Sequence, residues 1–157
     1  MGQSLAHLPV HAIFSARDRR PSLHSEEIRN EIYAYMAGTL KNLDCHPIKI
    51  GGVEDHVHVF CSLSKNIAFS DLIGRLKGTS SKRLKEKGLR DFGWQNGYAA
   101  FSVSESNMAS VTASIVNQAE HHKRFVKFSN ATGSPTTNAM FGIETPNGSD
   151  ALSGRVA

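Results

Sequence analysis

Apolar and polar positions alternate in some stretches of this chain and recur at helical spacing in others. Residues 10–16 (VHAIFSA) are largely apolar and run into the charged segment RDRRP, which is typical of a strand followed by a turn. From Ser25, a favourable helix N-cap, apolar residues recur every three or four positions. They are Ile28, Ile32, Tyr35, Met36, Leu40 and Leu43. The pattern predicts a strand followed by a helix.

The middle of the chain predicts two strands, a helix and a further strand. Residues 46–63 (HPIKIGGVEDHVHVFCSL) contain two apolar runs around a Gly-Gly-containing turn, which favours a β-hairpin. Helical spacing returns after Ser70, and its apolar positions are Leu72, Ile73, Leu76 and Leu84. Residues 97–104 (GYAAFSVS) predict the last strand.

A third helix is expected to begin at Asn107, as its N-cap, and to reach about residue 125. Its inner side would carry Met108, Val111 and Ile115. The order strand-helix-strand-strand-helix-strand-helix is close to the split βαβ, ferredoxin-like arrangement. The sequence therefore predicts an α+β fold with one antiparallel sheet and helices packed on one face.

The length and composition fit one soluble domain with a tail. A chain of 157 residues is long enough for one hydrophobic core. We expect the domain to span residues 1–128. Residues 129–157 are rich in Ser, Thr, Asn, Gly and Pro, which predicts loop or disorder.

The charge and the cysteine content indicate the kind of partner and the cellular compartment of the protein. The net charge of +4 and the pI near 9.2 favour a polyanionic partner. The only cysteines, Cys45 and Cys61, lie in apolar stretches and are expected to be reduced thiols of a cytosolic protein. No apolar run approaches the ~18 residues of a membrane helix, and no basic-then-apolar leader opens the chain. We therefore expect a cytoplasmic protein without a membrane partner.

Two histidines stand one residue apart in the predicted strand EDHVHVF. Side chains at positions i and i+2 of a strand share a face, so His56 and His58 would project together while Val57 and Val59 serve the core. Two neighbouring imidazoles suit a divalent metal ion and leave positions open for other ligands. The preceding Glu54 and Asp55 are expected to be turn residues, although either one could orient a histidine.

Basic residues gather on the second predicted helix. Residues 75–90 carry seven basic side chains against the single acid Glu86, a local charge of +6. The basic residues are Arg75, Lys77, Lys82, Arg83, Lys85, Lys87 and Arg90. The small residues 78–81 (GTSS) would let a phosphate backbone approach. Both a phosphate-binding surface and a solvated helix face fit this pattern.

Several blocks of the sequence together resemble a known family. HVHVF has the HUH pattern of histidine, hydrophobic residue and histidine. The blocks VHAIFSARDR, GGVEDHVHVFCSL, LKGTSSKRLKEKG, GYAAFSVS and IVNQAEHH, in this order, strongly resemble the single-tyrosine HUH transposases. These occur in the smallest bacterial insertion sequences and among their REP-associated relatives. The resemblance covers about residues 3–126.

The resemblance implies a function in DNA transposition. Members of this family cut and rejoin single-stranded DNA at hairpins near the ends of a mobile element, usually as homodimers. A Mg²⁺ or Mn²⁺ ion, held by the two histidines and a glutamine, polarises the scissile phosphate, and a tyrosine attacks it to form a 5′-phosphotyrosine. By this resemblance, His56, His58 and Gln118 are the expected metal ligands. The expected DNA-binding residues are Arg75, Lys77, Lys82, Arg83, Lys85 and Lys87, in a cytoplasmic, nucleoid-associated bacterial protein.

The expected nucleophile is missing. The family motif places its tyrosine four residues before the glutamine, on the same helix face, but that position is Ser114 here. A serine hydroxyl lies closer to the backbone and has a much higher pKa than the phenol's ~10, so it does not simply replace tyrosine. Tyr33 and Tyr35 are expected to pack on the core face of the first helix, and Tyr98 matches an ordinary family position. A catalytically silent DNA-binding relic or a repurposed regulator is therefore the alternative.

Other features leave two interpretations open. Trp94 fits a core position better than a stacking platform for a base. His121 and His122 fit a helix end better than a metal or phosphate role. The C-terminal tail also differs from the short helix and the aromatic, acidic end that family members usually carry.

Overall fold

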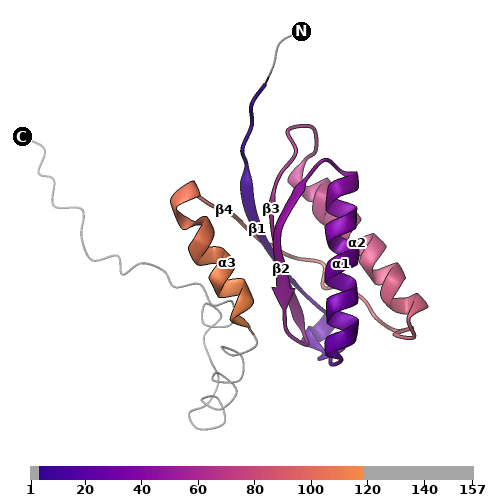
Figure 1. The fold of residues 1–157 in the computed structure, drawn as a ribbon. Coiled ribbons are helices and arrows are strands. Elements are labelled where there is room, and N and C mark those ends of the chain that lie inside the picture. Colours follow the sequence, from indigo (N-terminus) through magenta and orange to yellow (C-terminus); the bar gives the residue numbers. More distant parts are fainter. Residues whose placement is uncertain (1–3, 119–157) are drawn as a thin grey trace, which may run out of the picture.

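The order of the elements in the computed structural model follows the hydrophobic pattern. The structure describes residues 4–118. Its strands and longer helices are β1 (Pro9–Ser15), α1 (Glu26–Asn42), β2 (His46–Gly52), β3 (His56–Ser62), α2 (Phe69–Glu86), β4 (Ala99–Ser102) and α3 (Met108–Val116) (Figure 1). Two short 3₁₀ turns, η1 (Arg17–Arg19) and η2 (Glu105–Asn107), follow β1 and β4.

The four strands form one antiparallel sheet in the order β2-β3-β1-β4. The two central strands, β1 and β3, are thus neighbours although α1 and β2 separate them in the sequence. This is the split βαβ arrangement, so the predicted α+β class and antiparallel sheet are confirmed. In the register of β1 and β3, Ser15 pairs with His56, and Ile13 pairs with His58.

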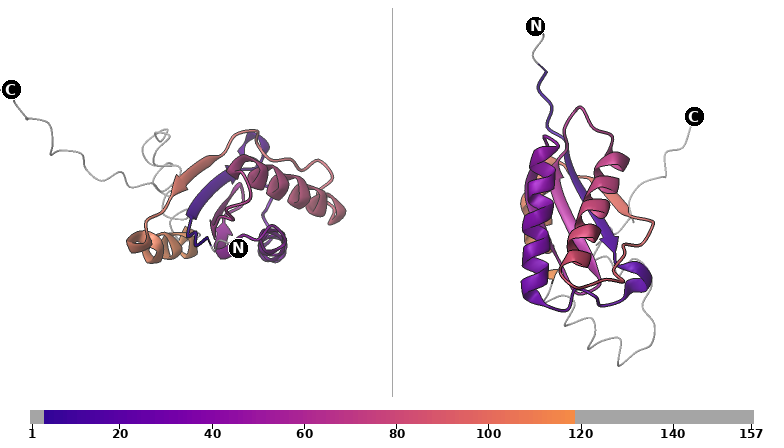
Figure 2. Two further views of the ribbon diagram at one scale, coloured as in Figure 1. Left: turned by 90° about the horizontal axis from the view of Figure 1, so that it is seen from above. Right: turned by 90° about the vertical axis from the view of Figure 1, so that its right-hand side faces the viewer.

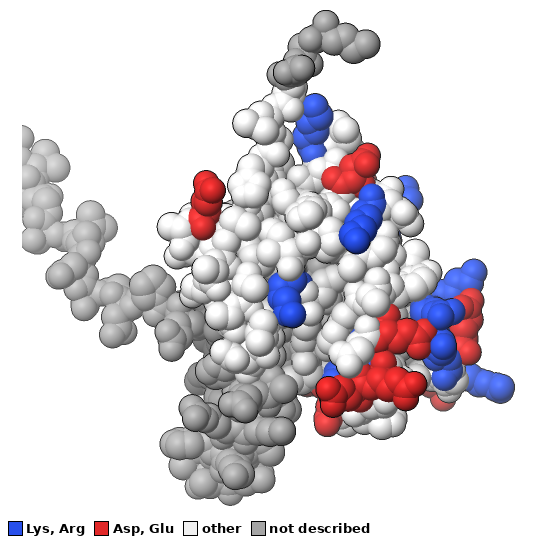
Figure 3. All heavy atoms as spheres, in the orientation of Figure 1, with Lys and Arg blue, Asp and Glu red and all other residues white. Residues whose placement is uncertain are grey.

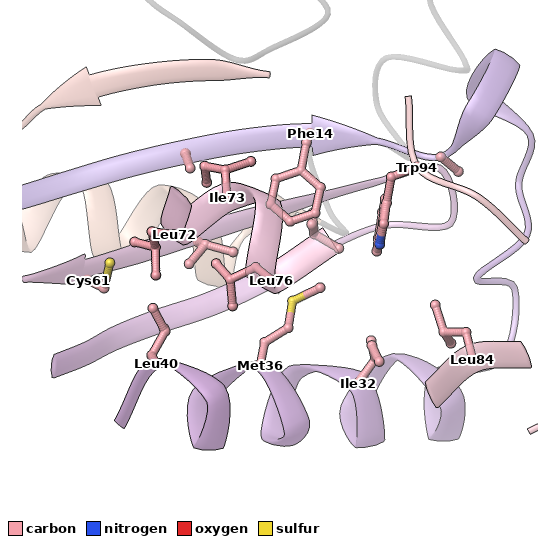
Figure 4. Close-up of a cluster of buried hydrophobic side chains, with 14 of the residues drawn as sticks. Phe14, Ile32, Met36, Leu40, Cys61, Leu72, Ile73, Leu76, Leu84 and Trp94 are labelled. Carbon is pink, nitrogen blue, oxygen red and sulfur yellow. The ribbon is translucent and has the colours of Figure 1, made fainter. Parts of the chain in front are cut away.

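One face of the sheet carries the main hydrophobic core. Alternate residues of β1 and β3, among them Phe14 and Val57, are buried there against α1 and α2. The helices contribute residues at the predicted three- and four-residue spacing, such as Met36 and Leu76, and Figure 4 shows them meeting beneath Phe14. Ser25 caps α1 as expected, because its hydroxyl accepts a hydrogen bond from the N–H of Ile28.

The third helix lies on the opposite face of the sheet (Figure 2). Ile115 of α3 is buried against Gly51 of β2, where an added Cβ would come within 2.8 Å of its side chain. Gly51 pairs with His58, so α3 packs on the face that carries the histidines. The expectation that all helices pack on one face is therefore wrong for α3, because the alternation within β3 makes both of its faces buried.

Two local expectations differ from the structure, and a third extends beyond the described residues. The side chain of Asn107 makes no capping hydrogen bond; the residue ends η2 instead. Helix α3 ends at Val116 and is followed by a turn at Asn117, and the expected continuation to about residue 125 lies outside the described residues. Tyr35 is 40% exposed on α1 and does not pack in the core.

Other expectations concern the thiols, the membrane and the C-terminal part. Cys45 and Cys61 are buried free cysteines, as predicted, and burial raises the pKa of the Cys61 thiol to about 12. Among residues 4–118, no helix is long and apolar enough to cross a membrane. The domain boundary at residue 128, the tail 129–157 and the pair His121 and His122 lie outside the described residues.

Candidate metal centre and DNA-binding residues

His56 and His58 lie side by side on β3, on the face that α3 covers. Their ring centroids are 5.2 Å apart, and only 2% and 1% of these residues is exposed. Val57 and Val59, between and after them, point into the core on the other face. The strand alternation thus presents two imidazoles on one face, as the sequence predicts.

A carboxylate contacts the Nδ1 side of the His56 ring. Nδ1 of His56 lies 2.7 Å from Oδ1 of Asp55, while Arg19 contacts the other carboxylate oxygen at 2.9 Å (Nη2) and 3.0 Å (Nε). Burial alone would raise the pKa of Asp55, but the hydrogen bond and charge of His56, together with Arg19, lower it. An ionised Asp55 accepts the Nδ1–H proton, which leaves Nε2 of His56 as the lone-pair nitrogen.

A third histidine plays the same part for His58. Nε2 of His11 on β1 lies 2.9 Å from Nδ1 of His58, and the two rings stack at 5.1 Å. Burial, followed by the charges of His56 and His11, lowers the pKa of His58 to about 2, and burial lowers that of His11 to about 4. Both rings are therefore neutral at pH 7. Nε2 of His58 is buried and has no hydrogen-bond partner among residues 4–118.

These contacts fit a divalent metal ion. Neutral imidazoles whose Nδ1 is engaged by a second side chain bind metals through Nε2, and a buried Nε2 without a protein partner is otherwise unfavourable. Within residues 4–118, no cluster of three His, Cys, Asp or Glu side chains is positioned for a metal. An amide oxygen, as expected from Gln118, is a further type of ligand that such an ion accepts.

Gln118 is buried just beyond the end of α3. It is 8% exposed and follows Ile115, which contacts the partner strand of His58, by three residues. Ser114 is half-buried, one residue before Ile115. Asn117 forms a turn between α3 and Gln118, and the residues after Gln118 lie outside the described part of the chain, so the expected Tyr-x-x-x-Gln geometry stays a prediction.

All three tyrosines of the chain lie away from the histidines. Tyr33 and Tyr35 are on α1, and Arg83 of α2 lies over the Tyr35 ring. Tyr98, just before β4, packs against Phe69 of α2 and beneath Lys77. Because α1 and α2 cover the other face of the sheet, no tyrosine of this chain reaches the histidine pair within one subunit.

The basic residues of α2 divide into two sets. Nζ of Lys77 donates to the carbonyls of Gln95, Asn96 and Gly97 at 2.7–3.2 Å, and so holds the loop before β4. Arg83 and Lys87 both pair with Glu31 of α1, at 2.8 and 3.1 Å. Figure 3 shows this mixture of positive and negative side chains at the lower right of the molecule.

The remaining basic residues of the helix are Arg75, Lys82 and Lys85. All three are exposed, and none has an ion-pair partner among residues 4–118. α2 lies across the sheet from the histidines, so this surface does not adjoin the histidine pair directly. The structure thus leaves half of the six expected DNA-binding side chains available to an external anion.

Two further residues of this region serve the core. Trp94 is 7% exposed, contacts Phe14 and Phe92 edge to face, and donates from Nε1 to the hydroxyl of Ser80 at 2.9 Å. Trp94 is therefore a core residue, the more favoured of its two interpretations. Ser80, within the small-residue segment 78–81, is fully buried and does not meet a phosphate.

Sequence reasoning missed two contributors to the site. His11 interrupts the apolar run VHAIFSA, and a polar residue at this place in a central strand was the available signal. Arg19 belongs to the segment RDRRP, where nothing in the sequence distinguishes it from its basic neighbours. Its place follows from η1, where Asp18 and Arg19 adopt left-handed φ values of 56° and 52°.

The antiparallel split-βαβ fold and the histidine pair, each ring contacted at Nδ1, describe a small α+β protein with a candidate metal centre. Residues 4–118 match the family model described as "Transposase IS200 like". The chain therefore belongs to the IS200-like transposase family, which supports a role in DNA transposition. No curated protein sequence matches the chain.

Solved structures of low sequence identity share the fold. One is a protein from Deinococcus radiodurans r1 assigned as a transposase, with 19% identity and a TM-score of 0.60, covering 75% of this chain and 96% of that one. Another is a REP-associated tyrosine transposase bound to a REP hairpin, with 13% identity and a TM-score of 0.58, covering 78% and 74% of the two chains.

Proposed function

We propose that this protein binds hairpin-forming single-stranded DNA together with a Mg²⁺ or Mn²⁺ ion, but lacks the nucleophile with which its family cuts DNA. The observation that carries the proposal is the histidine pair, each ring fixed at Nδ1 by a different side chain. When Nδ1–H of each ring is the donor, to Asp55 and to His11, the two Nε2 atoms present lone pairs that can serve as ligands. Two histidines that only fill a core would have both ring nitrogens bonded, whereas Nε2 of His58 has no partner among residues 4–118.

The proposed ligands are His56, His58 and the amide oxygen of Gln118. Of the two ions, Mn²⁺ suits two imidazole nitrogens better than Mg²⁺, which prefers oxygen ligands and water. When bound, the ion would polarise a phosphate of the DNA. The chain's own residues orient the ligands, through Asp55 and His11, and exclude water from them, through the cover of α3.

The missing nucleophile has a structural basis in addition to the sequence departure. Ser114 occupies the family's tyrosine position, and its hydroxyl ends several bonds short of a phenol. The tyrosines present lie across the sheet, next to α1 and α2. We therefore infer that the unmodified chain does not form a phosphotyrosine, and that it acts on DNA by binding, as a regulator or as a relic of a mobile element.

The DNA partner is supported by the similar REP-associated transposase, whose structure contains a REP hairpin. The proposal extends this partner to the present chain, with Arg75, Lys82 and Lys85 as the exposed basic residues of α2. A homodimer and association with the nucleoid are further parts of the proposal. Size-exclusion chromatography with light scattering tests the dimer.

Cleavage is tested with a labelled hairpin oligonucleotide carrying a single-stranded extension, incubated with Mn²⁺. We expect the unmodified protein to bind it without cutting, and the Ser114→Tyr variant to gain a covalent protein–DNA adduct. Ser110→Tyr, one turn earlier at an exposed position of α3, is the matched control and should gain none. A covalent adduct with the unmodified protein would contradict the missing nucleophile.

Binding is tested separately by fluorescence anisotropy at several salt concentrations. A hairpin should bind more tightly than an unstructured strand of the same composition, and the affinity should fall as salt rises. Equal binding of both oligonucleotides would remove the hairpin from the proposed function, and absent binding of both would remove DNA. Manganese binding, followed as a rise in melting temperature, should be lost in His56→Ala and kept in the exposed control His46→Ala.

A further inference from the structure

A pocket rich in arginine and lysine lies at the end of the sheet where β1 leaves it. The pocket has a volume of about 290 Å³. Four basic side chains line it, against one carboxylate, that of Asp91. They are Arg17, Arg20, Lys85 and Arg90, with Ser22, Phe92 and Gly93 completing the wall.

The cations of this pocket are not neutralised by the surrounding protein. Among residues 4–118, Arg17, Lys85 and Arg90 have no ion-pair partner. Arg20 has only a 3.8 Å contact with Asp18, in which both side chains are about two-thirds exposed. Placing four like charges around one pocket is unfavourable unless an anion joins them, because like charges repel. This contrasts with Arg83 and Lys87 of the same helix, which pair with Glu31.

The walls of the pocket are joined by hydrogen bonds. The N–H of Arg17 donates to the carbonyl of Gly93 at 2.8 Å, Ala16 forms a β-bridge with Trp94, and the N–H of Asp18 donates to Oε1 of Gln95 at 3.1 Å. The turn after β1 and the loop after α2 are thus fixed to one another. Because these hydrogen bonds fix the backbone that carries the arginines of the pocket, less conformational entropy is lost when a ligand binds.

Gly93 makes room for one of these arginines. A Cβ at this position would lie 2.6 Å from Nη2 and 3.0 Å from Cζ of Arg17. The guanidinium therefore lies directly over the glycine. An arginine fork held in place can bind two oxygens of one phosphate at once, which is why arginine predominates in phosphate recognition.

The same turn also reaches the histidine site. Arg19, between Arg17 and Arg20, binds Asp55, which in turn holds His56. Asp18 and Arg19 both have left-handed φ values, a conformation that residues other than glycine adopt rarely and that sends neighbouring side chains in different directions. Figure 1 shows this turn and the end of α2 at the same, lower end of the molecule.

We infer that this pocket, formed by Arg17, Arg20, Lys85 and Arg90, binds a phosphate group, and that in the DNA complex it holds a backbone phosphate next to the strand at the histidine pair. The second part rests on the proposed function. The pocket gives α2 a role at its C-terminal end, where Lys85 meets the turn after β1. The phosphate source is the DNA backbone, and a free phosphate ion is the competing source.

The first arm of the test uses inorganic phosphate without DNA. Phosphate is titrated into the protein while backbone amide NMR shifts are recorded. We expect saturable shifts at Arg17, Ser22 and Gly93, and their loss in the double variant Arg17→Gln/Arg90→Gln. The double variant Lys41→Gln/Lys65→Gln removes the same charge from exposed positions away from the pocket and should keep the shifts. Shifts that persist in the pocket variant would overturn the pocket as a phosphate site.

The second arm measures affinity for the hairpin oligonucleotide as a function of salt. The pocket variant should bind roughly tenfold or more weakly than the protein, because charge-assisted hydrogen bonds are lost. The slope of log K against log salt should fall by about 0.7 for each single-strand phosphate contact that is lost. An equal loss in the Lys41→Gln/Lys65→Gln control would show general electrostatics, and would overturn the DNA part.

A third variant tests the geometry without changing the charge. Gly93→Ala displaces only the flexible end of Arg17, and its backbone φ does not require glycine, so the fold is kept. We expect weaker hairpin binding from Gly93→Ala alone and no further loss when it is added to Arg17→Gln. Additive losses in this cycle would overturn the placement of Arg17 over Gly93 as the binding arrangement.

The outcomes separate this inference from the proposed function. If the protein binds no hairpin but phosphate shifts depend on Arg17 and Arg90, the proposed function fails while the phosphate site holds. If hairpin binding is normal in the pocket variant, the site serves free phosphate and the DNA part fails. Manganese-induced stabilisation should be unchanged in every pocket variant, which confirms that the histidine site is intact.

Discussion

The two faces of the sheet differ in the polarity of the side chains that they bury. The face beneath α1 and α2 buries a continuous set of apolar side chains, and the buried indole N–H of Trp94 is paired with Ser80. The face beneath α3 buries the imidazoles of His56 and His58, and Nε2 of His58 has no partner among the described residues. Burying polar groups lowers stability unless each one is bonded. The first face therefore stabilises the fold, whereas the second maintains an arrangement that needs a ligand to complete it.

Both faces come from the same strand, with a period of two. Val57, Val59 and Cys61 serve the first face, and His56, His58 and Phe60 serve the second. A shift of β3 by one residue would bury the histidines under α1 and α2 and destroy both functions. We therefore expect substitutions on the face beneath α1 and α2 to change stability, and substitutions on the face beneath α3 to change metal binding.

The largest effect is expected from the apolar face. Leu76→Ala removes a fully buried side chain of α2 from the core cluster, and should lower the free energy of unfolding by about 2–5 kcal/mol. Urea denaturation measures it. Manganese binding by the fraction that remains folded should be unchanged. A loss of manganese affinity in folded Leu76→Ala would show that the two faces are coupled.

His58→Leu is expected to do the opposite of Leu76→Ala: it should change the stability little and abolish metal binding. Leucine removes a buried Nε2 that has no partner among the described residues, but it also removes the contact with His11, so the stability of the metal-free protein should fall by no more than about 1 kcal/mol. The variant should lose the stabilisation by manganese, which for the unmodified protein is about 2.7 kcal/mol at a hundred times Kd. Thermal melts with and without Mn²⁺ give both quantities. A strong loss of stability without metal would make His58 a structural residue.

A smaller effect on metal binding is expected from Asp55, which contacts the expected ligand His56. Asp55→Asn keeps the size of the side chain but removes the charge that orients His56, and it should weaken manganese binding by about 10–100-fold. Calorimetric titration measures the change. Glu54→Gln, at the exposed neighbouring position, is the control and should leave the affinity unaltered. Equal affinities of Asp55→Asn and the unmodified protein would remove Asp55 from the site.

The sequence predicted the apolar face better than the polar one. The spacing of Ile32, Met36 and Leu40 identifies the core side of α1 because burial repeats along a helix, and these three residues are buried. Periodicity also placed His56 and His58 on one face. It did not place α3, because β3 is buried on both sides and its pattern does not say which helix covers which side.

The supporting contacts of the histidines were harder to predict. Asp55 was recognised as one of two possible orienting residues, since it adjoins His56. His11 was missed because it becomes a neighbour of His58 only through the pairing of β1 with β3, across 47 residues of sequence. The ion pairs within the charge run of α2 were hard to predict for a similar reason. Glu31, which pairs with Arg83 and Lys87, comes from another helix.

The smallest predicted effect contrasts two basic residues of α2. Lys82 is exposed without an ion pair among the described residues, whereas Arg83 is bound to Glu31 by two hydrogen bonds, from Nε and Nη2. A cation that already has a carboxylate partner contributes little to counterion release on binding DNA. Lys82→Gln should therefore lower the salt slope of hairpin binding by up to about 0.7–0.9, and Arg83→Gln by clearly less. Anisotropy titrations over a range of salt concentrations measure both slopes. Equal reductions would mean that Glu31 releases Arg83 to the DNA, and that the outer surface of α2 acts as one basic face.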